Sequence, residues 1–453
     1  MDKQLADAID SRNEIFGRGP IRRLVFCLTL ILLFVSGDRA FAQEAQDMSA
    51  EFSPTLGNGD SPLLTPGTII GPNNVDDYKH LLDQVLVERV RVGDLQLTLG
   101  PELDFPVHPR YLQATERYAG EPELDSAPGE LTGYKGGRPF PGLSASDPQS
   151  GVKAAWNMRY AYSPDEIETA HFIWRYRNMV SGKLERTLNM YGAILRYAYR
   201  HSHDPVPELE NNPAQLFSAL YLRVSSPQDI RNTQLLIHRA LQDRAPEQAW
   251  LYLNTQRRVK RIATGQKTDA FLGSDIMIED FLGYNGRIVD MEWTLLGSDE
   301  LLLPMYAHSQ LDLDDQEVSE AGFRDVAFAG AGACFPEVTW QLRKVFHLQA
   351  VPRDKRHPLS KRHYIIDAAT FSPVLTHIYD RGGELWKLGI VALSHSGYHT
   401  PGNEEWRGVI TDAVTMVDLQ ARHCTTLSIN SRLATEPMGH KTFNTSYMRQ
   451  MGR

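Results

Sequence analysis

The histidines are the residues of this sequence with the greatest potential for metal binding or acid–base chemistry. His395 and His399 have the i, i+4 spacing at which two histidines on one helix bind a metal ion. The intervening Gly397 and the Thr-Pro that follows oppose a helix at this place. Other histidines stand in polar turns or loops, namely His201, His203, His357 and His363. We therefore expect isolated surface histidines and predict no metal site.

A serine esterase is the second chemistry that short motifs suggest. The Gly-Asp-Ser run that ends at Ser61 resembles the serine block of one esterase class, and Asp354 and His357 have the spacing of its acid and base. In that class the serine follows a buried strand and the pair lies near the C-terminus. Here Ser61 lies in a segment rich in proline and glycine, and a long part of the chain follows His357. Because no Gly-x-Ser-x-Gly elbow is present either, we predict no catalytic residues and no enzyme activity.

Two further motifs carry weaker signals. Residues 328–334 are rich in glycine but lack the strand–turn–helix setting of a phosphate-binding loop, so we predict no cofactor. Residues 256–261 form a short basic stretch, which is typical of a strand face in solvent. Its charged side chains are candidates for contact with an anionic head group or an acidic partner, and they are Arg257, Arg258, Lys260 and Arg261.

The composition is that of a globular protein that can bury a core. Apolar residues make up 42% of the 453 residues, and charged residues make up 23%. The net charge of −9 argues against nucleic-acid binding, because such binding depends on clustered lysines and arginines that neutralise phosphates.

The N-terminus has the organisation of a secretory signal peptide. A polar segment that ends in two arginines is followed by an apolar run at residues 24–35 and by the small-residue motif that ends at Ala42. The apolar run is shorter than the roughly 20 residues that span a bilayer, and no other segment could cross a membrane. We therefore predict a signal peptide at residues 1–42, cleavage after Ala42 and a periplasmic location. The alternative is an uncleaved membrane anchor.

Cleavage after this motif would leave two cysteines, Cys334 and Cys424. An oxidising compartment favours a disulfide, but the sequence leaves open whether the two residues meet in space. Because only two cysteines would remain, a metal site made of four cysteines is excluded.

The mature chain is predicted to consist of a flexible lead-in and one domain. Residues 43–74 are rich in Gly, Pro, Ser and Asp and have little periodicity. A helix is predicted from Val75, because two asparagines precede it and two aspartates stand in its first turn. We therefore expect a single domain at residues 75–453, with a long loop at residues 121–150.

Alternation of apolar and polar residues dominates the chain after Val152. Two alternating runs flank the Asp-Arg-Gly-Gly turn at residues 380–383, which predicts a hairpin. Strands joined by short turns pair antiparallel, with one face buried and the other in solvent. The clearest predicted strands are residues 152–162, 338–344 and 409–419. Helical interruptions are predicted at residues 166–173, 227–240 and 274–281.

Large aromatic side chains occupy many inward positions of the predicted strands. They are either core residues that each bury a large area, or the lining of an apolar cavity inside a curved sheet. For the second interpretation, the candidate lining residues are Trp156, Met158, Tyr160, Trp250, Tyr252 and Trp293.

Several blocks of the sequence resemble known families. Residues 250–262 and 271–281 are similar to a block shared by outer-membrane lipoprotein-sorting-like proteins. Further blocks resemble one branch of these proteins, the domain-of-unknown-function family 1329 (DUF1329), and they are residues 137–142, 147–157, 357–367, 379–386 and 443–453. Residues 301–336 depart from the pattern of that family.

The resemblance implies a mainly β (α+β) fold similar to that of the lipoprotein carriers LolA and LolB. This fold is a strongly curved antiparallel sheet, or unclosed half-barrel, with helices that cover an apolar cavity. The resemblance also implies a periplasmic protein without established enzyme activity that works beside outer-membrane proteins and lipid-exporting pumps. The family supplies no catalytic residues.

Three functions are consistent with these observations. The first is a carrier for a lipid, lipoprotein or other lipophilic molecule, since an acyl chain of about sixteen methylenes in water costs on the order of 13 kcal/mol, at roughly 0.8 kcal/mol per methylene. The second is a non-carrier accessory subunit of an outer-membrane or efflux complex. The third is a secreted hydrolase of an unrecognised type.

Overall fold

A computed structural model describes most of the chain after residue 63, and the described residues are 64–125, 129–263, 267–311, 324–400, 402–434 and 436–452. The predicted signal peptide, its cleavage site and Ser61 lie outside the described residues. No helix in the described part is both long and apolar enough to cross a membrane.

Short helices and short strands make up the N-terminal part of the described chain. These elements are β1 (Ile69–Ile70), α3 (Val75–Tyr78), α4 (Gln84–Arg91), β2 (Leu97–Leu99), α5 (Pro109–Arg117), β3 (Glu123–Leu124), β4 (Leu131–Thr132) and α6 (Ser150–Arg159). β1 lies in the predicted lead-in and pairs with β2. The predicted loop at residues 121–150 contains the hairpin of β3 and β4.

Long strands follow in two groups. The first group is β5 (Glu166–Asn178), β6 (Leu184–Arg196), β7 (Leu216–Ser226), β8 (Gln234–Ala240), β9 (Gln248–Leu253) and β10 (Arg258–Arg261). The second group is β11 (Met291–Leu303), β15 (Thr339–Pro352), β16 (Leu359–Asp367), β17 (Pro373–Asp380), β18 (Leu385–His395), β19 (Val409–Asp418) and β20 (His423–Leu433). Between β11 and β15 lie β12 (Met305–Tyr306), β13 (Phe328–Ala329) and β14 (Phe335–Pro336), and the last helix is α7 (Thr445–Met451).

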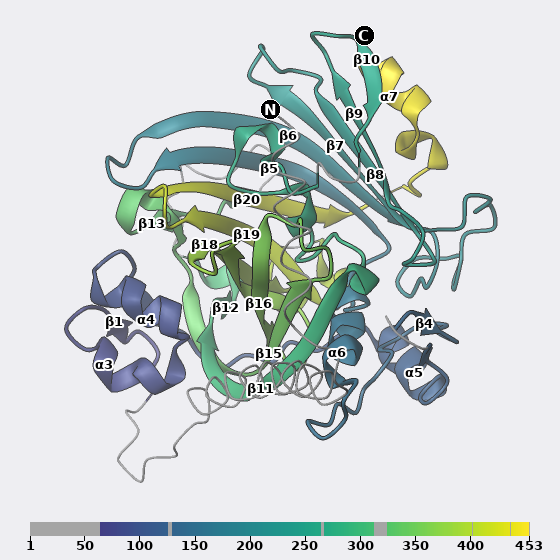
Figure 1. The fold of residues 1–453 in the computed structure, drawn as a ribbon. Coiled ribbons are helices and arrows are strands. Elements are labelled where there is room, and N and C mark those ends of the chain that lie inside the picture. The colour runs from purple at the N-terminus through teal and green to yellow at the C-terminus, as the bar shows by residue number, and fades with distance from the viewer. Residues whose placement is uncertain are drawn as a thin grey trace, which may run out of the picture. The chain divides into compact units, whose positions relative to one another are not determined.

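The two groups of strands join into one curved antiparallel sheet (Figure 1). β5 to β10 form one meander and β15 to β20 form another, and β20 pairs with β5 through contacts such as Leu427 with Trp174. β11 extends the sheet beyond β15. In the described part of the chain, β10 and β11 do not pair with each other, so the sheet is not closed into a barrel. The predicted fold class is confirmed.

Three of the strand predictions are confirmed. The run at residues 338–344 begins β15, and the run at residues 409–419 is β19. The turn at residues 380–383 joins β17 to β18, and its Gly383 has a φ of +90°, a backbone conformation that favours glycine.

The predicted strand at residues 152–162 is wrong, because most of this segment forms helix α6. Ala154, Ala155 and Trp156 are all buried, so the helix has little exposed face to reveal a period of 3.6. α6 packs closely on β11. A Cβ added to Gly151 would lie 2.2 Å from the carbonyl oxygen of Trp293, which shows how near the two backbones come.

The predicted helices at residues 166–173 and 227–240 are also wrong. The first segment begins β5, which pairs with both β20 and β6, and the second ends in β8. Pairing with distant strands therefore overrides the local pattern. The third predicted helix, at residues 274–281, contains only the short 3₁₀ turn Ile278–Asp280.

The helix predicted from Val75 begins there but ends after four residues, and α4 follows it. Asp83 caps α4 by accepting a hydrogen bond from the Val85 amide, at 3.0 Å. Its carboxylate also lies 2.9 Å from Nε2 of His377 on β17, so a buried polar contact joins α4 to the sheet. The apolar side of α4 packs on the face of β15 to β20 that contains Leu375, Ile390 and Val417.

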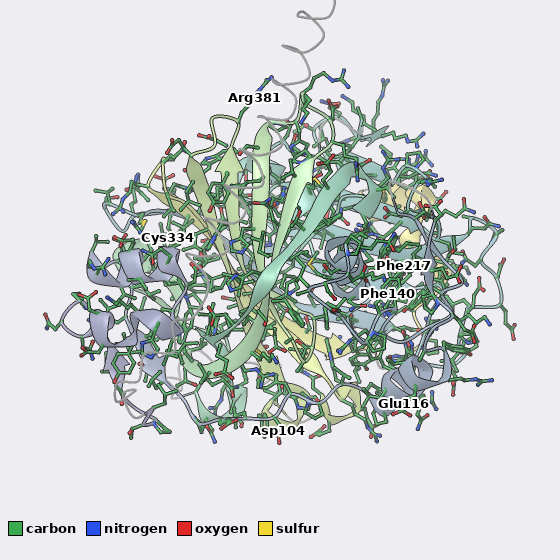
Figure 2. The ribbon with its side chains drawn as sticks, turned by 60° about the horizontal axis from the view of Figure 1, so that its bottom comes forward. Asp104, Glu116, Phe140, Phe217, Cys334 and Arg381 are labelled. Atoms are coloured by element: carbon green, nitrogen blue, oxygen red, sulfur yellow. A yellow bond between two sulfur atoms is a disulfide. The ribbon has the colours of Figure 1, made fainter. Side chains whose placement is uncertain are left out.

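Cys334 and Cys424 form a disulfide, which settles the question that the sequence leaves open. Cys334 lies in the same core cluster as α4, and Figure 2 shows it beside the N-terminal helices. Cys424 lies on β20. The bond therefore connects the segment before β15 to the middle of the sheet.

Candidate functional site

One face of the sheet carries a continuous apolar surface, which we call the apolar face. Its buried side chains come from strands of both meanders, and they are Phe172, Trp174, Tyr176, Leu188, Met190, Leu222, Val224, Leu235, Ile237, Ala249, Leu359, Ile378, Met416 and Leu427. Alternation along each strand directs these side chains to the same side of the sheet.

An irregular segment lies on the apolar face. Residues 267–281, which we call the covering segment, belong to the connection between β10 and β11 and contain short 3₁₀ turns. Trp174 makes edge-to-face contacts with Phe271 and Phe281, with ring centroids 5.8 Å and 6.2 Å apart. The other apolar side chains of the segment in this cluster are Ile276, Met277 and Ile278. Side chains of the covering segment therefore pack against the apolar face.

A buried arginine fastens one end of the covering segment. Arg362 on β16 donates a hydrogen bond to Glu279, at 2.9 Å, and a second one to Asp280. His357 lies 3.3 Å from the same Glu279 carboxylate. Burial alone would raise the pKa of Glu279, but the adjacent His357 and the charge of Arg362 lower it to about 2. Glu279 is therefore ionised at neutral pH.

A second polar contact fastens the covering segment at Asp275. Its carboxylate accepts a hydrogen bond from the Thr425 hydroxyl, at 2.7 Å, and lies 2.8 Å from Nδ1 of His423. Its carbonyl oxygen accepts a hydrogen bond from Nζ of Lys387, at 2.6 Å. Side chains of β18 and β20 thus hold this part of the segment in place. No long series of backbone hydrogen bonds does so among the described residues.

The six candidate lining residues lie in two different clusters. Trp156, Met158 and Tyr160 lie on or directly after α6, and they pack with the half-buried Trp293 of β11. Phe217 belongs to the same cluster, and Figure 2 shows it beside Phe140. Trp250 and Tyr252 of β9 lie on the side of the sheet opposite to the apolar face, where they pack against α7. The structure brings four of the six together, and a role in ligand binding stays a prediction.

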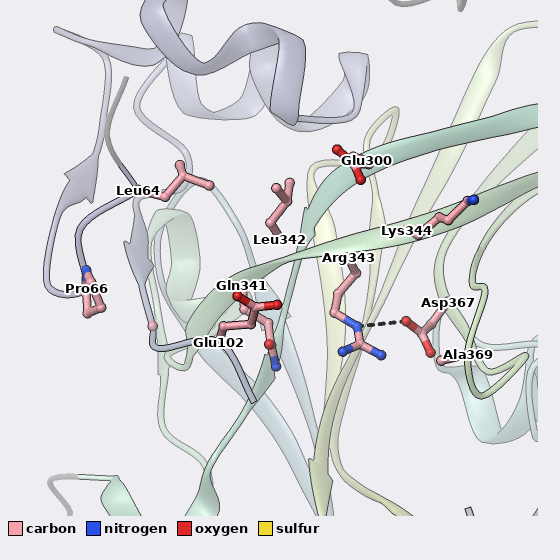
Figure 3. Close-up of a pocket in the computed structure, with 11 residues that line it drawn as sticks. Leu64, Pro66, Glu102, Glu300, Gln341, Leu342, Arg343, Lys344, Asp367 and Ala369 are labelled. Atoms are coloured by element: carbon pink, nitrogen blue, oxygen red, sulfur yellow. Dashed lines mark hydrogen bonds and ion pairs between the residues drawn. The ribbon is translucent and has the colours of Figure 1, made fainter. Parts of the chain in front are cut away.

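A pocket of about 430 Å³ lies where the N-terminal segment meets β11 and β15 (Figure 3). Apolar side chains such as Leu64 and Leu342 share its wall with Glu300 and Lys344, which face each other across the strand pair. Nε of Arg343 donates a hydrogen bond to Asp367, at 2.8 Å. The pocket has the volume of a ligand site, but its charged wall suits a polar group better than an acyl chain.

The expectation of isolated surface histidines is wrong for most of the six. His201, His363, His395 and His399 are buried, because each packs or bonds against groups from distant parts of the chain. For example, Nε2 of His201 accepts a hydrogen bond from the Gly137 amide, at 3.0 Å. Burial lowers the pKa of His201 to about 4. Polar neighbours along the sequence gave no signal of these contacts.

The side chains of Asp354 and His357, the two described members of the esterase motif, have different partners. Asp354 is exposed and accepts hydrogen bonds from the side chain of Arg356, whereas His357 lies beside Glu279. Arg362, Glu279 and Asp280 are the site residues that sequence reasoning missed. Glu279 and Asp280 stand between apolar residues, which was a signal, but Arg362 stands among polar ones, and only the fold shows that the three meet.

The four basic candidates lie on the hairpin of β9 and β10, at the edge of the sheet. Arg257, Arg258, Lys260 and Arg261 are all exposed. Contact with a head group or a partner stays a prediction for them.

Comparison with known families covers nearly the whole described region. The family model described as "Protein of unknown function (DUF1329)" matches residues 69–449. The chain belongs to the DUF1329 family. The resemblance found in the sequence is thus confirmed, and the match includes both meanders and the covering segment of this DUF1329 protein.

The DUF1329 protein is also similar to individual relatives. An uncharacterized protein of Pseudomonas aeruginosa is 26% identical over 372 residues, which are 78% of this chain and 73% of the relative. A domain from Vibrio parahaemolyticus that carries the name of an outer membrane lipoprotein-sorting protein is 18% identical, with a TM-score of 0.45 over 67% of this chain and 100% of that one. A DUF1329 family protein from Desulfovibrio piger is 13% identical, with the same TM-score and the same two coverages.

Proposed function

We propose that this DUF1329 protein is a periplasmic binding protein that carries a lipid, the acyl part of a lipoprotein or another lipophilic molecule, without catalysis. The observation that supports this most strongly is the apolar face, which spans both meanders and lies under an irregular segment. An acyl chain in water costs about 0.8 kcal/mol per methylene, so a carrier must offer it apolar surface. The predicted signal peptide supports the periplasmic location.

The ligand would take the place of the apolar side chains of the covering segment. Phe271 and Phe281 would move away from Trp174, and an acyl chain would pack against Trp174 in their place. Because one apolar contact replaces another, this exchange costs little hydrophobic free energy. The barrier would come from the ion pairs of Arg362 and the contacts of Asp275.

The first test is direct. The full chain is exported, purified from the periplasm without detergent, and extracted with organic solvent for mass spectrometry. We expect a lipophilic molecule in near-stoichiometric amount, and a mature N-terminus at Gln43. The delipidated protein should bind N-phenyl-1-naphthylamine saturably, and a fatty acid should displace this probe. Absence of both an extracted molecule and saturable probe binding would overturn the proposal.

A second test examines the covering segment. Replacing Glu279→Gln and Asp280→Asn together removes both charges that Arg362 holds, so we expect faster association of the probe. The matched control replaces Glu404→Gln and Glu405→Gln, two exposed carboxylates in another loop. Equal association rates in the two variants would place the ligand elsewhere, and the pocket beside Lys344 would be examined next.

A second candidate function is an accessory module that docks on an anionic surface. The observation that favours it is the exposed basic hairpin at the sheet edge. Charge reversal by Arg258→Glu with Lys260→Glu should abolish binding to vesicles of phosphatidylglycerol, while probe binding on the apolar face stays unchanged. No binding of the unmodified protein to these vesicles would exclude this candidate.

A further inference from the structure

Three side chains from three separate segments meet in a buried cluster away from the apolar face. His308 follows β12, His399 follows β18, and Asp412 lies on β19. Each residue can offer one ligand atom, and these atoms all lie within 4.8 Å of one another. The three side chains are between 0% and 1% exposed.

Both histidines direct a ring nitrogen at the same carboxylate. Nε2 of His399 lies 2.8 Å from Oδ1 of Asp412, and Nδ1 of His308 lies 3.3 Å from Oδ2. The two imidazole rings stack with their centroids 4.3 Å apart. Two imidazole nitrogens and one carboxylate oxygen form a donor set that binds zinc in proteins.

The neighbours of Asp412 differ from those of several other buried carboxylates of this protein. Glu166, Asp243 and Glu279 each pair with a buried arginine. In the part of the chain that the structure describes, the basic side chains within ion-pair distance of Asp412 are histidines alone. A divalent cation would bring positive charge to this buried carboxylate.

Surrounding groups contact the three side chains. The Thr400 hydroxyl lies 2.9 Å from Nδ1 of His399, and Nδ2 of Asn403 lies 3.2 Å from the same nitrogen. The Tyr306 hydroxyl donates to Oδ2 of Asp412, at 2.7 Å, and lies 3.1 Å from Nδ1 of His308. Nε2 of His308 is buried and has no hydrogen-bond partner among the described residues.

We propose that His308, His399 and Asp412 bind one zinc ion. The ion fastens the segment after β12 and the loop after β18 to β19, so its role is structural. The Tyr306 hydroxyl lies within hydrogen-bond distance of two of these ligands, His308 and Asp412. This site is independent of the proposed lipid binding, because none of its residues belongs to the apolar face or the covering segment.

Metal analysis of the full chain tests the proposal. The protein is stripped with a chelator, dialysed, and titrated with Zn²⁺ alone and with Co²⁺ as a spectroscopic probe. We expect one ion per chain, and visible Co²⁺ bands that are typical of nitrogen and oxygen ligands. His399→Gln and Asp412→Asn should each weaken binding at least 100-fold, whereas His80→Gln, which changes an exposed histidine, should not.

Thermal unfolding covers the case in which a ligand variant does not fold. The stripped, unmodified protein should melt several degrees higher with excess Zn²⁺, because an ion that binds only the folded state stabilises it. No stoichiometric metal together with no rise in melting temperature would overturn the proposal. Full binding in folded His308→Gln and His399→Gln variants would also overturn it.

Discussion

His423 on β20 lies 2.8 Å from the carboxylate of Asp275 in the covering segment. This contact joins β20, which pairs with β5 where the two meanders meet, to a segment that carries no long secondary structure of its own. It is also a contact whose strength depends on pH near neutrality, because histidine changes charge there.

The first prediction concerns this pH dependence. The hydrogen bond to Asp275 raises the pKa of His423 above its ordinary value, and the charges of Asp275 and Glu185 add to the effect. A raised pKa in the folded state means that the stabilisation is complete below the unfolded value of about 6.5 and is lost as pH rises through the folded value. Hydrogen exchange of residues 267–281, corrected for intrinsic rates, should therefore show less protection at pH 8.5 than at pH 6.

The matched variant is His423→Gln, which keeps a hydrogen-bond donor but carries no charge. Its covering segment should show little change in protection between the two pH values. An equal loss of protection in the variant and the unmodified protein would contradict the role of His423.

The second prediction concerns Arg362, which is buried between two carboxylates. Arg362→Met should lower the free energy of unfolding by about 3–5 kcal/mol, since it leaves buried charges without a partner. Urea denaturation measures this loss. Adding Glu279→Gln and Asp280→Asn to Arg362→Met should recover a large part of it, because the unpaired charges are then gone.

The control for this series is Arg356→Met, a change in an exposed arginine that pairs with Asp354. Its denaturation midpoint should stay unchanged. An Arg362→Met variant as stable as this control would show that the buried ion pairs contribute nothing.

The third prediction concerns the disulfide. Cys334 and Cys424 are 90 residues apart in sequence, so their bond removes much conformational freedom from the unfolded chain. Replacing both residues with alanine should lower stability by about 2–5 kcal/mol, as measured by thermal and urea unfolding. Each single replacement should cost about as much as the double one, because either change abolishes the bond. Unchanged melting of the double variant would contradict the prediction.

The fourth prediction concerns the close approach of α6 to β11. Gly151→Ala places a Cβ 2.2 Å from the carbonyl oxygen of Trp293, so the helix must move away. We expect a loss of about 1–3 kcal/mol in the free energy of unfolding, as is typical of overpacking. Gly142→Ala is the control, since its new Cβ would meet no atom within 4 Å. Equal stability of the two variants would show that α6 tolerates the shift.

Local features of the sequence were sufficient for part of the fold. The hairpin at residues 380–383 was predictable because glycine in a short turn and alternation in its flanking strands are both local properties. A helix begins at Val75 as predicted, although the side chain of Asn74 does not cap it. The family resemblance supplied the curvature of the sheet and its open edge, which no single strand pattern contains.

Other features depended on contacts between distant parts of the chain. α6 alternates over a few residues like a strand, yet it is a helix because its buried positions fit against β11 and the loop before it. β5 became a strand because β20 and β6 flank it on both sides. Such pairings join residues that are far apart in sequence, so a local window cannot report them.

The sequence by itself determined the class of this protein: a mainly β member of the DUF1329 family with a predicted export signal. The tertiary structure decided which polar residues meet. Arg362 with Glu279, His423 with Asp275, and His399 with Asp412 are each brought together by the folding of separate strands and loops. A charged residue within an apolar stretch of sequence indicates that the residue needs a partner. Only the tertiary structure shows which residue that partner is.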